Sequence, residues 1–452
     1  MTAERRGDHD VRHALLVDLY ELTMVDAFHR EGLAEEPSTF SLYVRHLPPG
    51  RGYLVAAGLA DALTWLEELH FDAADLAALE RVGGFGDEFL RWLSCVRFTG
   101  DVRAVPEGTI VFEHEPILEV DAPIGQAQLA ETFLLNQVTL QTTLATKASR
   151  FRHAAGDASV VDFALRRTHG IDAGMKLARC CRIVGLGGTS NVAASDRYGF
   201  PASGTMAHSF VQAHDDETDA FRTFAQYMTD RAVLVVDTYD TATGVGHAIE
   251  VARELAAHGT AIRGIRLDSG DLAALARDAR ARLDAAGLGN VLIFASGGLD
   301  EHAIEELRAA GAPIDGYGVG SSLGTSADAP VLDSVYKLVE FAGRPVVKTS
   351  TGKATWPGPK QVWRDARWSG DVLALRDEPA PGARWRPLLE EVMRAGIRTD
   401  AGRRDLAAVA AHFDAGWESL PEPIKHLTDP APYPTLPSTR LVELAEELGG
   451  TS

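Results

Sequence analysis

The sequence predicts an irregular parallel α/β barrel together with a separate α+β domain. Between about residues 155 and 325, short apolar runs alternate with amphipathic helical stretches, a pattern typical of strands joined by helices in a parallel sheet. The apolar runs are nearly continuous, which indicates strands buried on both faces. Polar residues follow almost every run, as they do where strand ends meet at one face of a barrel. A barrel is therefore favoured over an open doubly wound sheet.

Seven segments supply the expected barrel strands. In chain order they are SVVDFALRR, RIVGLGGTSN, FPASGTMAHS, AVLVVDTYD, GIRLDSGD, VLIFASGG and DGYGVGSS. Helices are expected between several of them, because Phe221, Phe224, Ala225 and Met228 recur at helical spacing. The stretch LAALARDARARLDAAG likewise ends in a glycine suited to a helix C-terminus.

The segments on either side of the barrel have a different composition. The first 115 residues mix a helical pattern, GLADALTWLEELHF, with strand-like runs, TFSLYVRHL and TIVFEHEPILEV. The last 110 or so residues are rich in Gly, Pro and Trp before a final amphipathic stretch, STRLVELAEELGG. We predict an N-terminal α+β domain over residues 1–115, a catalytic barrel over 116–342, and a C-terminal segment over 343–452 that packs on the N-terminal domain.

The charge balance and the cysteines restrict the class of protein. Among 452 residues, 44 Lys and Arg face 64 Asp and Glu, and a net charge of -20 disfavours binding to nucleic acid. The three cysteines, Cys95, Cys180 and Cys181, form no CxxC motif, so neither a disulfide framework nor a cysteine zinc site is expected. The N-terminal stretch has no apolar signal core, and no run is long enough to span a bilayer. These features predict a cytoplasmic protein without a membrane partner.

Glycine-rich turns are the first candidates for ligand contacts. The sequence has neither a Walker loop nor a dinucleotide-binding GxGxxG motif. LGGTSN, ASGG and GVGSSLG each follow an apolar run, and their small residues would let backbone N–H groups approach a phosphate. Any one of them is more often a plain turn, but three at the same end of a barrel favour phosphate binding. The candidate phosphate-binding residues are Gly297, Gly298, Gly320 and Ser321.

Charged residues at the expected strand ends are the second group of candidates. Arg166 ends one run and suits a phosphate, although such a residue is more often simply at the surface. Strand alternation sends Arg266 and Asp268 to the same side, where they form either a structural ion pair or part of a site. Asp237 and Asp240 end another run and could orient an imidazole, bind ribose hydroxyls or hold Mg²⁺.

His208 lies in PASGTMAHSF, directly after a flexible turn, and a lone histidine is more often a hydrogen-bonded core residue than a catalytic one. The other motifs change that reading. The ordered set LVDLYELTM, DFALRRTHG, GGTSNVAASDRYGFPASGTMAHSF, LVVDTYDT, GIRLDSGDL and GYGVGSS with VYKLVE resembles the nicotinate phosphoribosyltransferases over roughly residues 14–365. Six linked motifs in order are far more specific than any single one.

The resemblance implies a phosphoribosyltransferase type II-like fold and a reaction. The family joins nicotinate to 5-phosphoribosyl 1-pyrophosphate in NAD salvage and couples this to hydrolysis of ATP, with Mg²⁺, through a phosphorylated histidine. His208 matches that histidine, with Asp237 as the carboxylate that orients it. No residue is assigned to a resident metal ion, and no structural zinc is expected.

The resemblance also implies the substrate contacts and a homodimer. Thr205 and Arg266 match positions that hold the pyridine carboxylate, and Asp268 matches one that faces the ribose. Ser209 and Arg166 complete the predicted substrate-binding set. Tyr20 matches an aromatic residue that stacks on the pyridine ring across a dimer interface, so the active sites would be shared between subunits.

The sequence shows two departures from the family pattern and leaves three alternative functions. Gly298 stands where many relatives carry an Asp or another polar residue, and Ser321 stands where Thr is common. These departures put the phosphate contacts in doubt. A nicotinamide-using enzyme of the same fold would share His208 and the DSGD strand end, whereas quinolinate phosphoribosyltransferase lacks the ATP-dependent histidine. A non-catalytic sensor of pyridine nucleotides is the alternative from another class, and the intact set of charged residues argues against it.

Overall fold

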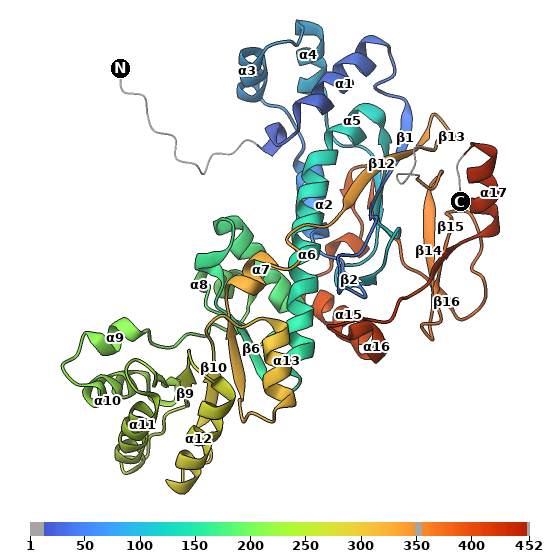
Figure 1. Cartoon of the computed structure of the whole chain (residues 1–452). Helices are drawn as coiled ribbons and strands as arrows, with labels where there is room; N and C mark the ends of the chain where they lie inside the picture. The colour runs from blue at the N-terminus through green and yellow to red at the C-terminus, as the bar shows by residue number, and fades with distance from the viewer. Residues whose placement is uncertain (1–12, 349–354, 450–452) are drawn as a thin grey trace, which may run out of the picture. The chain divides into compact units, whose positions relative to one another are not determined.

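The computed structural model (Figure 1) describes residues 13–348 and 355–449. The chain forms two compact units. The first comprises Met1–Thr142, Val331–His426 and Pro430–Ser452, and the second comprises Thr143–Pro330 and Leu427–Asp429. The division falls within the long helix α6 (Glu131–Ala155). We predicted no export signal in the N-terminal stretch, and most of that stretch lies outside the described residues.

The limits of the two units differ from the predicted domain boundaries. The first unit does not stop at residue 115, because the next strand, β5 (Pro116–Pro123), pairs with β1 (Pro37–Val44) on one side and with β3 (Asp101–Ala104) on the other. It resumes before residue 343, because β12 (Ser334–Phe341) pairs along the other edge of β1. Strand pairings between distant segments therefore set these limits, and local composition does not reveal them.

The described residues of the first unit form three sheets. The largest has seven strands in the order β13-β12-β1-β5-β3-β17-β18, all antiparallel. A second has the order β16-β14-β15-β19, and β2 pairs with β4 in a third. The remaining strands of this unit are β2 (Leu54–Val55), β4 (Ile110–Val111), β13 (Arg344–Pro345), β14 (Lys360–Asp365), β15 (Asp371–Leu375), β16 (Trp385–Pro387), β17 (Glu390–Arg394), β18 (Ile397–Arg398) and β19 (Thr435–Pro437).

Helices of the first unit cover its sheets and close a large apolar core. The expected helical stretch near residue 60 is α2, whose Leu63, Trp65 and Leu66 are buried, and the final amphipathic stretch is α17. The helices of this unit are α1 (Leu19–Arg30), α2 (Leu59–Glu68), α3 (Ala73–Val82), α4 (Asp87–Cys95), α5 (Ile124–Leu129), α15 (Leu406–Ser419), α16 (Glu422–Lys425) and α17 (Thr439–Glu447), with short 3-10 turns at His13–Leu15 and Ala401–Arg403.

The second unit is built on a parallel sheet of six strands in the order β7-β6-β11-β10-β9-β8. Its strands are β6 (Ser159–Asp162), β7 (Gly188–Thr189), β8 (Val233–Val235), β9 (Gly264–Leu267), β10 (Leu292–Ala295) and β11 (Gly316–Val319). The last strand, β11, pairs with the first, β6, so the order is that of a barrel left open between β7 and β8. This arrangement confirms the irregular parallel barrel predicted from the alternating pattern.

One predicted barrel strand is wrong. The segment FPASGTMAHS does not form a seventh strand, because it makes a single β-bridge, between Ala202 and Thr189. Pro201 lacks an N–H and Gly204 lacks a side chain, so neither favours extended pairing. The barrel is irregular at this position, and the chain passes directly into the short helix α9 (His208–Gln212).

Helices follow the strands of the second unit, and several of them begin at acidic or amide caps. Asp240, Asp271 and Asp300 each accept a hydrogen bond from the backbone N–H of the residue three positions on. Capping therefore accounts for Asp240, which we considered as a ligand. These helices are α7 (Ile171–Ile183), α8 (Val192–Tyr198), α10 (Glu217–Met228), α11 (Thr241–Ala256), α12 (Leu272–Ala285), α13 (Glu301–Ala309) and α14 (Ser321–Thr325), with 3-10 turns at Leu165–Arg167 and Thr229–Arg231.

Candidate functional site

Four of the predicted residues meet at the carboxyl ends of β8 and β9, beside the opening of the barrel. Asp237 follows β8, Arg266 lies in β9, and Asp268 comes directly after β9. His208 is the first residue of α9, which follows the segment that fails to form a strand. Because β8 and β9 run in parallel, their ends present these side chains at one edge.

His208 contacts both neighbouring strand ends. Its Nδ1 lies 3.2 Å from the Thr238 hydroxyl, and its Nε2 lies 3.6 Å from Oδ2 of Asp268. The side chain is 38 % exposed, so the ring is accessible while both nitrogens have polar neighbours. This imidazole is held at a site edge and is not a core histidine.

The carboxylate of Asp237 binds the turn after β9, and its predicted role in orienting His208 stays a prediction. Its Oδ2 accepts hydrogen bonds from the backbone N–H of Asp268 at 2.9 Å and from the hydroxyl of Ser269 at 2.8 Å. The turn after β9 therefore draws this carboxylate away from the imidazole, and Asp268 is the carboxylate beside His208. Oδ1 of Asp237 is buried and has no hydrogen-bond partner within the described ranges 13–348 and 355–449.

Arg266 is a mostly buried guanidinium with spare hydrogen-bonding capacity. Its Nη1 donates to the Thr205 hydroxyl, and its Nε lies 3.9 Å from Oδ1 of Asp268. That Nε is buried and makes no hydrogen bond to any residue that the structure describes. Burial lowers the pKa of Arg266, while the charges of Asp268 and Asp237 act in the opposite direction.

Asp268 remains ionised despite partial burial. Burial opposes its charge, but a hydrogen bond from the Ser296 hydroxyl and the charge of Arg266 outweigh it and hold the pKa of Asp268 below its usual value. The proximity of Arg266 and Asp268 confirms that both side chains leave the strand on the same side. Their long separation shows that they are not a tight structural ion pair.

The predicted glycine turns lie at the ends of β10 and β11. Gly297 has a φ of +90°, and a Cβ there would lie 1.8 Å from the carbonyl oxygen of Asp268, so only glycine fits. Gly298 has open space around it. Gly320 precedes α14, a helix of five residues that begins at Ser321. The two turns follow neighbouring strands of the sheet, and phosphate binding by them stays a prediction.

The other predicted residues are less closely placed. Arg166 is exposed in the turn after β6, where its charge is near enough to lower the pKa of Arg266. Ser209 is exposed on α9 next to His208. Tyr20 belongs to the first unit, on α1, with 47 % of its surface exposed. Its predicted role across a dimer interface stays a prediction.

Comparison with known proteins decides the family. Residues 15–139 match the nicotinate phosphoribosyltransferase (NAPRTase) N-terminal domain, and residues 158–356 match the nicotinate phosphoribosyltransferase (NAPRTase) family. The chain is 48 % identical to nicotinate phosphoribosyltransferase pncB2 of Mycobacterium tuberculosis, over 96 % of this chain and 93 % of the relative. The chain belongs to the nicotinate phosphoribosyltransferase family.

Further relatives support this family assignment. The nicotinate phosphoribosyltransferase of Bacillus subtilis is 44 % identical over 82 % of this chain and 78 % of the relative. The crystal structure of human nicotinic acid phosphoribosyltransferase has a TM-score of 0.86 at 29 % identity and covers 96 % of this chain and 100 % of that chain. The chain is thus an enzyme of the nicotinate phosphoribosyltransferase family, with the type II phosphoribosyltransferase fold.

Sequence reasoning missed two residues of the site. Thr238 contacts His208, and Ser296 fixes Asp268. Both stood in motifs already noted, directly after Asp237 and directly before Gly297. Their roles depend on which neighbouring strand end each hydroxyl faces, and spacing within one motif does not reveal that.

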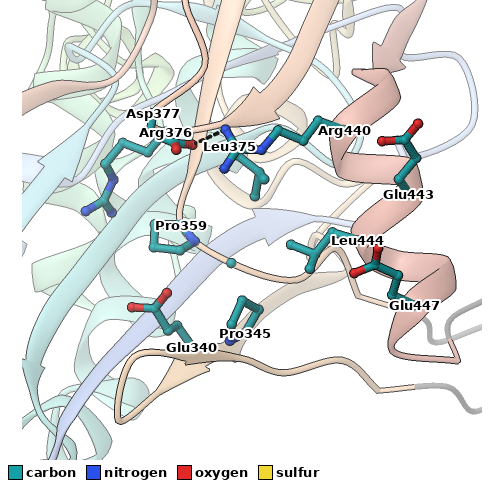
Figure 2. A pocket seen from close by; sticks show the side chains of 11 residues that line it. Glu340, Pro345, Pro359, Leu375, Arg376, Asp377, Arg440, Glu443, Leu444 and Glu447 are labelled. Carbon is teal, nitrogen blue, oxygen red and sulfur yellow. Dashed lines mark hydrogen bonds and ion pairs between the residues drawn. The ribbon is translucent and has the colours of Figure 1, made fainter.

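A cavity of about 690 Å³ in the first unit has a lining that does not suit the family's anionic substrates (Figure 2). Arg440 pairs with Asp377 at 2.9 Å along its lining. The other arginine of the lining, Arg376, binds Glu119 and Asp121 at 2.8 Å each. The acidic residues Glu340, Glu443 and Glu447 also line the cavity, so a phosphorylated ligand would meet net negative charge. None of the predicted site residues lines it.

No helix within the described ranges is both long and apolar enough to cross a membrane.

Proposed function

We propose that the chain joins nicotinate to 5-phosphoribosyl 1-pyrophosphate, giving nicotinate mononucleotide and pyrophosphate for NAD salvage. The pyridine nitrogen attacks C1 of the ribose with its lone pair, and the bond from C1 to the pyrophosphate oxygen breaks as pyrophosphate leaves. The observation that best supports this reaction is Arg266, a mostly buried guanidinium with an unpartnered Nε. A family member that must bind a carboxylated base needs such a group.

Arg266 would bind the carboxylate of nicotinate together with Thr205. A guanidinium offers two parallel donors to a carboxylate, and Nε can supply one of them. The partial burial of Arg266 weakens screening by water and strengthens the pairing. Nicotinamide offers one acceptor and an NH₂ group that would face the guanidinium unfavourably, so this contact selects nicotinate.

Asp268 would stabilise the ribose as the reaction proceeds. Positive charge develops on the sugar when the bond from C1 to pyrophosphate lengthens, and an ionised carboxylate in a fixed position lowers the energy of that state. The lowered pKa of Asp268 keeps the carboxylate ionised at neutral pH. The hydrogen bond from Ser296 holds it in place.

The leaving pyrophosphate and Mg²⁺ would lie toward Asp237, Arg166 and the glycine turns. The buried, unpartnered Oδ1 of Asp237 fits a hard cation that prefers oxygen ligands. When bound, Mg²⁺ would neutralise charge on the pyrophosphate. Arg166 and backbone N–H groups near Gly297, Gly298, Gly320 and Ser321 would supply the remaining contacts.

His208 would couple the reaction to ATP. A ring nitrogen with a free lone pair attacks the γ-phosphorus of ATP, ADP leaves, and water later hydrolyses the phosphohistidine to phosphate. Such a nucleophile needs its proton held on the other nitrogen. Thr238 lies at Nδ1 and Asp268 lies near Nε2, so the proton has a partner on whichever ring nitrogen carries it. The exposed ring leaves room for a phosphate.

The test is product formation by the purified protein. With nicotinate, 5-phosphoribosyl 1-pyrophosphate, Mg²⁺ and ATP labelled at the γ-phosphate, we expect nicotinate mononucleotide, release of ADP and acid-labile label on the protein. His208→Ala should remove the label and nicotinate-stimulated ATP hydrolysis, because no other group replaces the imidazole. His214→Ala, which changes a histidine six positions on, is the matched control.

Four outcomes would contradict the proposal. Product from quinolinate and 5-phosphoribosyl 1-pyrophosphate without ATP would indicate the ATP-independent relative. Equal use of nicotinamide would remove Arg266 as the selecting group. Binding of pyridine nucleotides without any product would favour the non-catalytic sensor. Nicotinate-stimulated ATP hydrolysis at the parent rate in His208→Ala would show that this residue is not the phosphate acceptor.

A further inference from the structure

We propose that His46, Glu113 and His114 form a zinc site in the first unit, in contrast to the expectation from the sequence that no structural zinc is bound. One donor atom from each side chain lies within 4.8 Å of the others. All three residues belong to the first unit, whereas the candidate residues around His208 belong to the second. None of the three is among the residues proposed for phosphoribosyl transfer, and the zinc proposal does not rest on that function.

Two backbone segments bring the three side chains together. His46 lies just past β1, and Glu113 and His114 occupy the turn between β4 and β5. The backbone N–H of His114 donates to the carbonyl of Val44 at 2.8 Å, which attaches this turn to the end of β1. In addition, the backbone N–H of Leu47 donates to Oε1 of Glu113 at 2.6 Å. The residues thus stand on a fixed frame although they are far apart in the sequence.

The backbone of His114 adopts a conformation that is uncommon for residues other than glycine. Its φ is +64°, in the left-handed region, where asparagine, aspartate and histidine are the enriched non-glycine types. Residues held in such conformations cluster at functional sites, because the surrounding structure must compensate for the strain. The ring of His114 packs near Tyr43 and meets the ring of His46 edge-on, with centroids 5.9 Å apart.

The spacing of the donor atoms is close to that of a zinc site. Tetrahedral ligands with bonds of about 2.0–2.1 Å lie about 3.3 Å apart. The present limit of 4.8 Å requires a shift of roughly 1.5 Å at most by this geometry. His46 is exposed and can rotate toward the other two, whereas the carboxylate of Glu113 is already oriented by Leu47.

The donor set favours zinc over the hard cations. Two imidazole nitrogens and one carboxylate oxygen suit Zn²⁺, whereas Mg²⁺ and Ca²⁺ prefer oxygen ligands throughout. The neighbouring cation, Arg45, has Asp333 3.4 Å from its Nη1, which offsets its charge. Three protein ligands leave a fourth position to water, as is common where zinc is bound by three side chains.

The test is a Zn²⁺ titration of untagged, full-length protein after removal of metal with a chelator. Competition against a chromophoric chelator should show one Zn²⁺ per chain that resists competition in the parent. We expect His46→Ala and His114→Asn each to weaken this binding by on the order of a hundredfold, as loss of a ligand requires. Asparagine at position 114 tolerates the left-handed backbone and removes the imidazole.

Two further variants make the result decisive. Glu113→Gln keeps an oxygen acceptor for the N–H of Leu47 but loses the charge, so it should bind Zn²⁺ more weakly while remaining folded. His70→Ala removes another exposed histidine of the first unit and should bind like the parent. Circular dichroism checks that every variant is folded.

Co²⁺ provides a second measurement of the same site. Substituted into the parent, it should give the strong visible absorption of a four-coordinate ion, and this should vanish in the doubly substituted protein, His46→Ala with His114→Asn. The proposal is overturned if that protein binds Zn²⁺ as tightly as the parent, or if the parent binds no Zn²⁺ that withstands the chelator.

Discussion

Two buried arginines, one in each unit, have opposite surroundings. In the first unit, Arg364 donates from Nε and Nη2 to Asp371 at 2.9 and 2.5 Å and from Nη1 to the carbonyl of Ile110 at 2.6 Å. In the second unit, Arg266 donates from Nη1 to the Thr205 hydroxyl, and its Nε is unpartnered within the described part of the chain. A satisfied guanidinium stabilises a fold, whereas one with an unused donor is available to a ligand.

The pKa values of the two arginines are shifted in opposite directions. Burial opposes both charges, but Glu115 and Asp371 outweigh it and raise the pKa of Arg364. Burial prevails at Arg266 and lowers its pKa. Three aromatic rings, Phe112, Trp368 and Tyr433, also lie within 6.0 Å of the Arg364 guanidinium. Burial alone therefore does not distinguish a structural arginine from a ligand-binding one.

The largest expected effect is on synthesis of nicotinate mononucleotide, and it concerns whether residues of the two units act together across a dimer. Tyr20→Ala and His208→Ala chains should each be inactive in ATP-coupled synthesis, because each lacks one part of the proposed site. After subunit exchange, a heterodimer regains one competent site, measured as recovered nicotinate mononucleotide synthesis. Verified exchange without recovery would show that Tyr20 does not complete the partner's site.

The same substitution at the two arginines should separate stability from function. Arg364→Met leaves Asp371 and Glu115 buried without their cation, so we expect a loss of about 3–5 kcal/mol in the free energy of unfolding. Arg266→Met should change it by less than about 1 kcal/mol, because few bonds are lost. Urea denaturation monitored by fluorescence measures both. Equal losses would mean that Arg266 is as structural as Arg364.

The buried carboxylate of Glu21, in the first unit, should make the stability of the protein depend on pH. Oε1 of Glu21 accepts a 2.6 Å hydrogen bond from Thr132, but Oε2 has no partner among the described residues. Burial, with the nearby charge of Glu131, raises the pKa of Glu21 to about 8. The folded state therefore binds an extra proton between the unfolded pKa of about 4.3 and the folded value, so stability falls as pH rises through this window.

Glu21→Gln should remove this part of the pH dependence. Relative to the variant, the parent should lose about 3 kcal/mol in the free energy of unfolding between pH 5 and pH 8. The difference between the two proteins cancels titration of all other groups that the substitution leaves unchanged. Parallel pH profiles for parent and variant would contradict the raised pKa.

The barrel could be predicted from the sequence because the pattern that indicates it is local. Apolar runs alternating with helices, and polar residues at the run ends, depend on neighbours within about 20 residues. The same reasoning placed His208, Arg266 and Asp268 at one edge. It did not foresee that Asp237 binds the turn after the next strand, 31 residues on. It also failed for the strand at FPASGTMAHS, where the apolar run forms only one bridge.

The most direct test of the account is the choice of base by Arg266. The ratio of kcat/KM for nicotinate to that for nicotinamide should be at least about a hundred in the parent, since an unpaired charge in a dry site costs about 2–5 kcal/mol. Arg266→Lys keeps the charge but loses the planar fork and should erode most of this ratio. Arg263→Lys, at an exposed arginine just before β9, should leave it unchanged. Unchanged discrimination in Arg266→Lys, or equal use of both bases by the parent, would contradict the account.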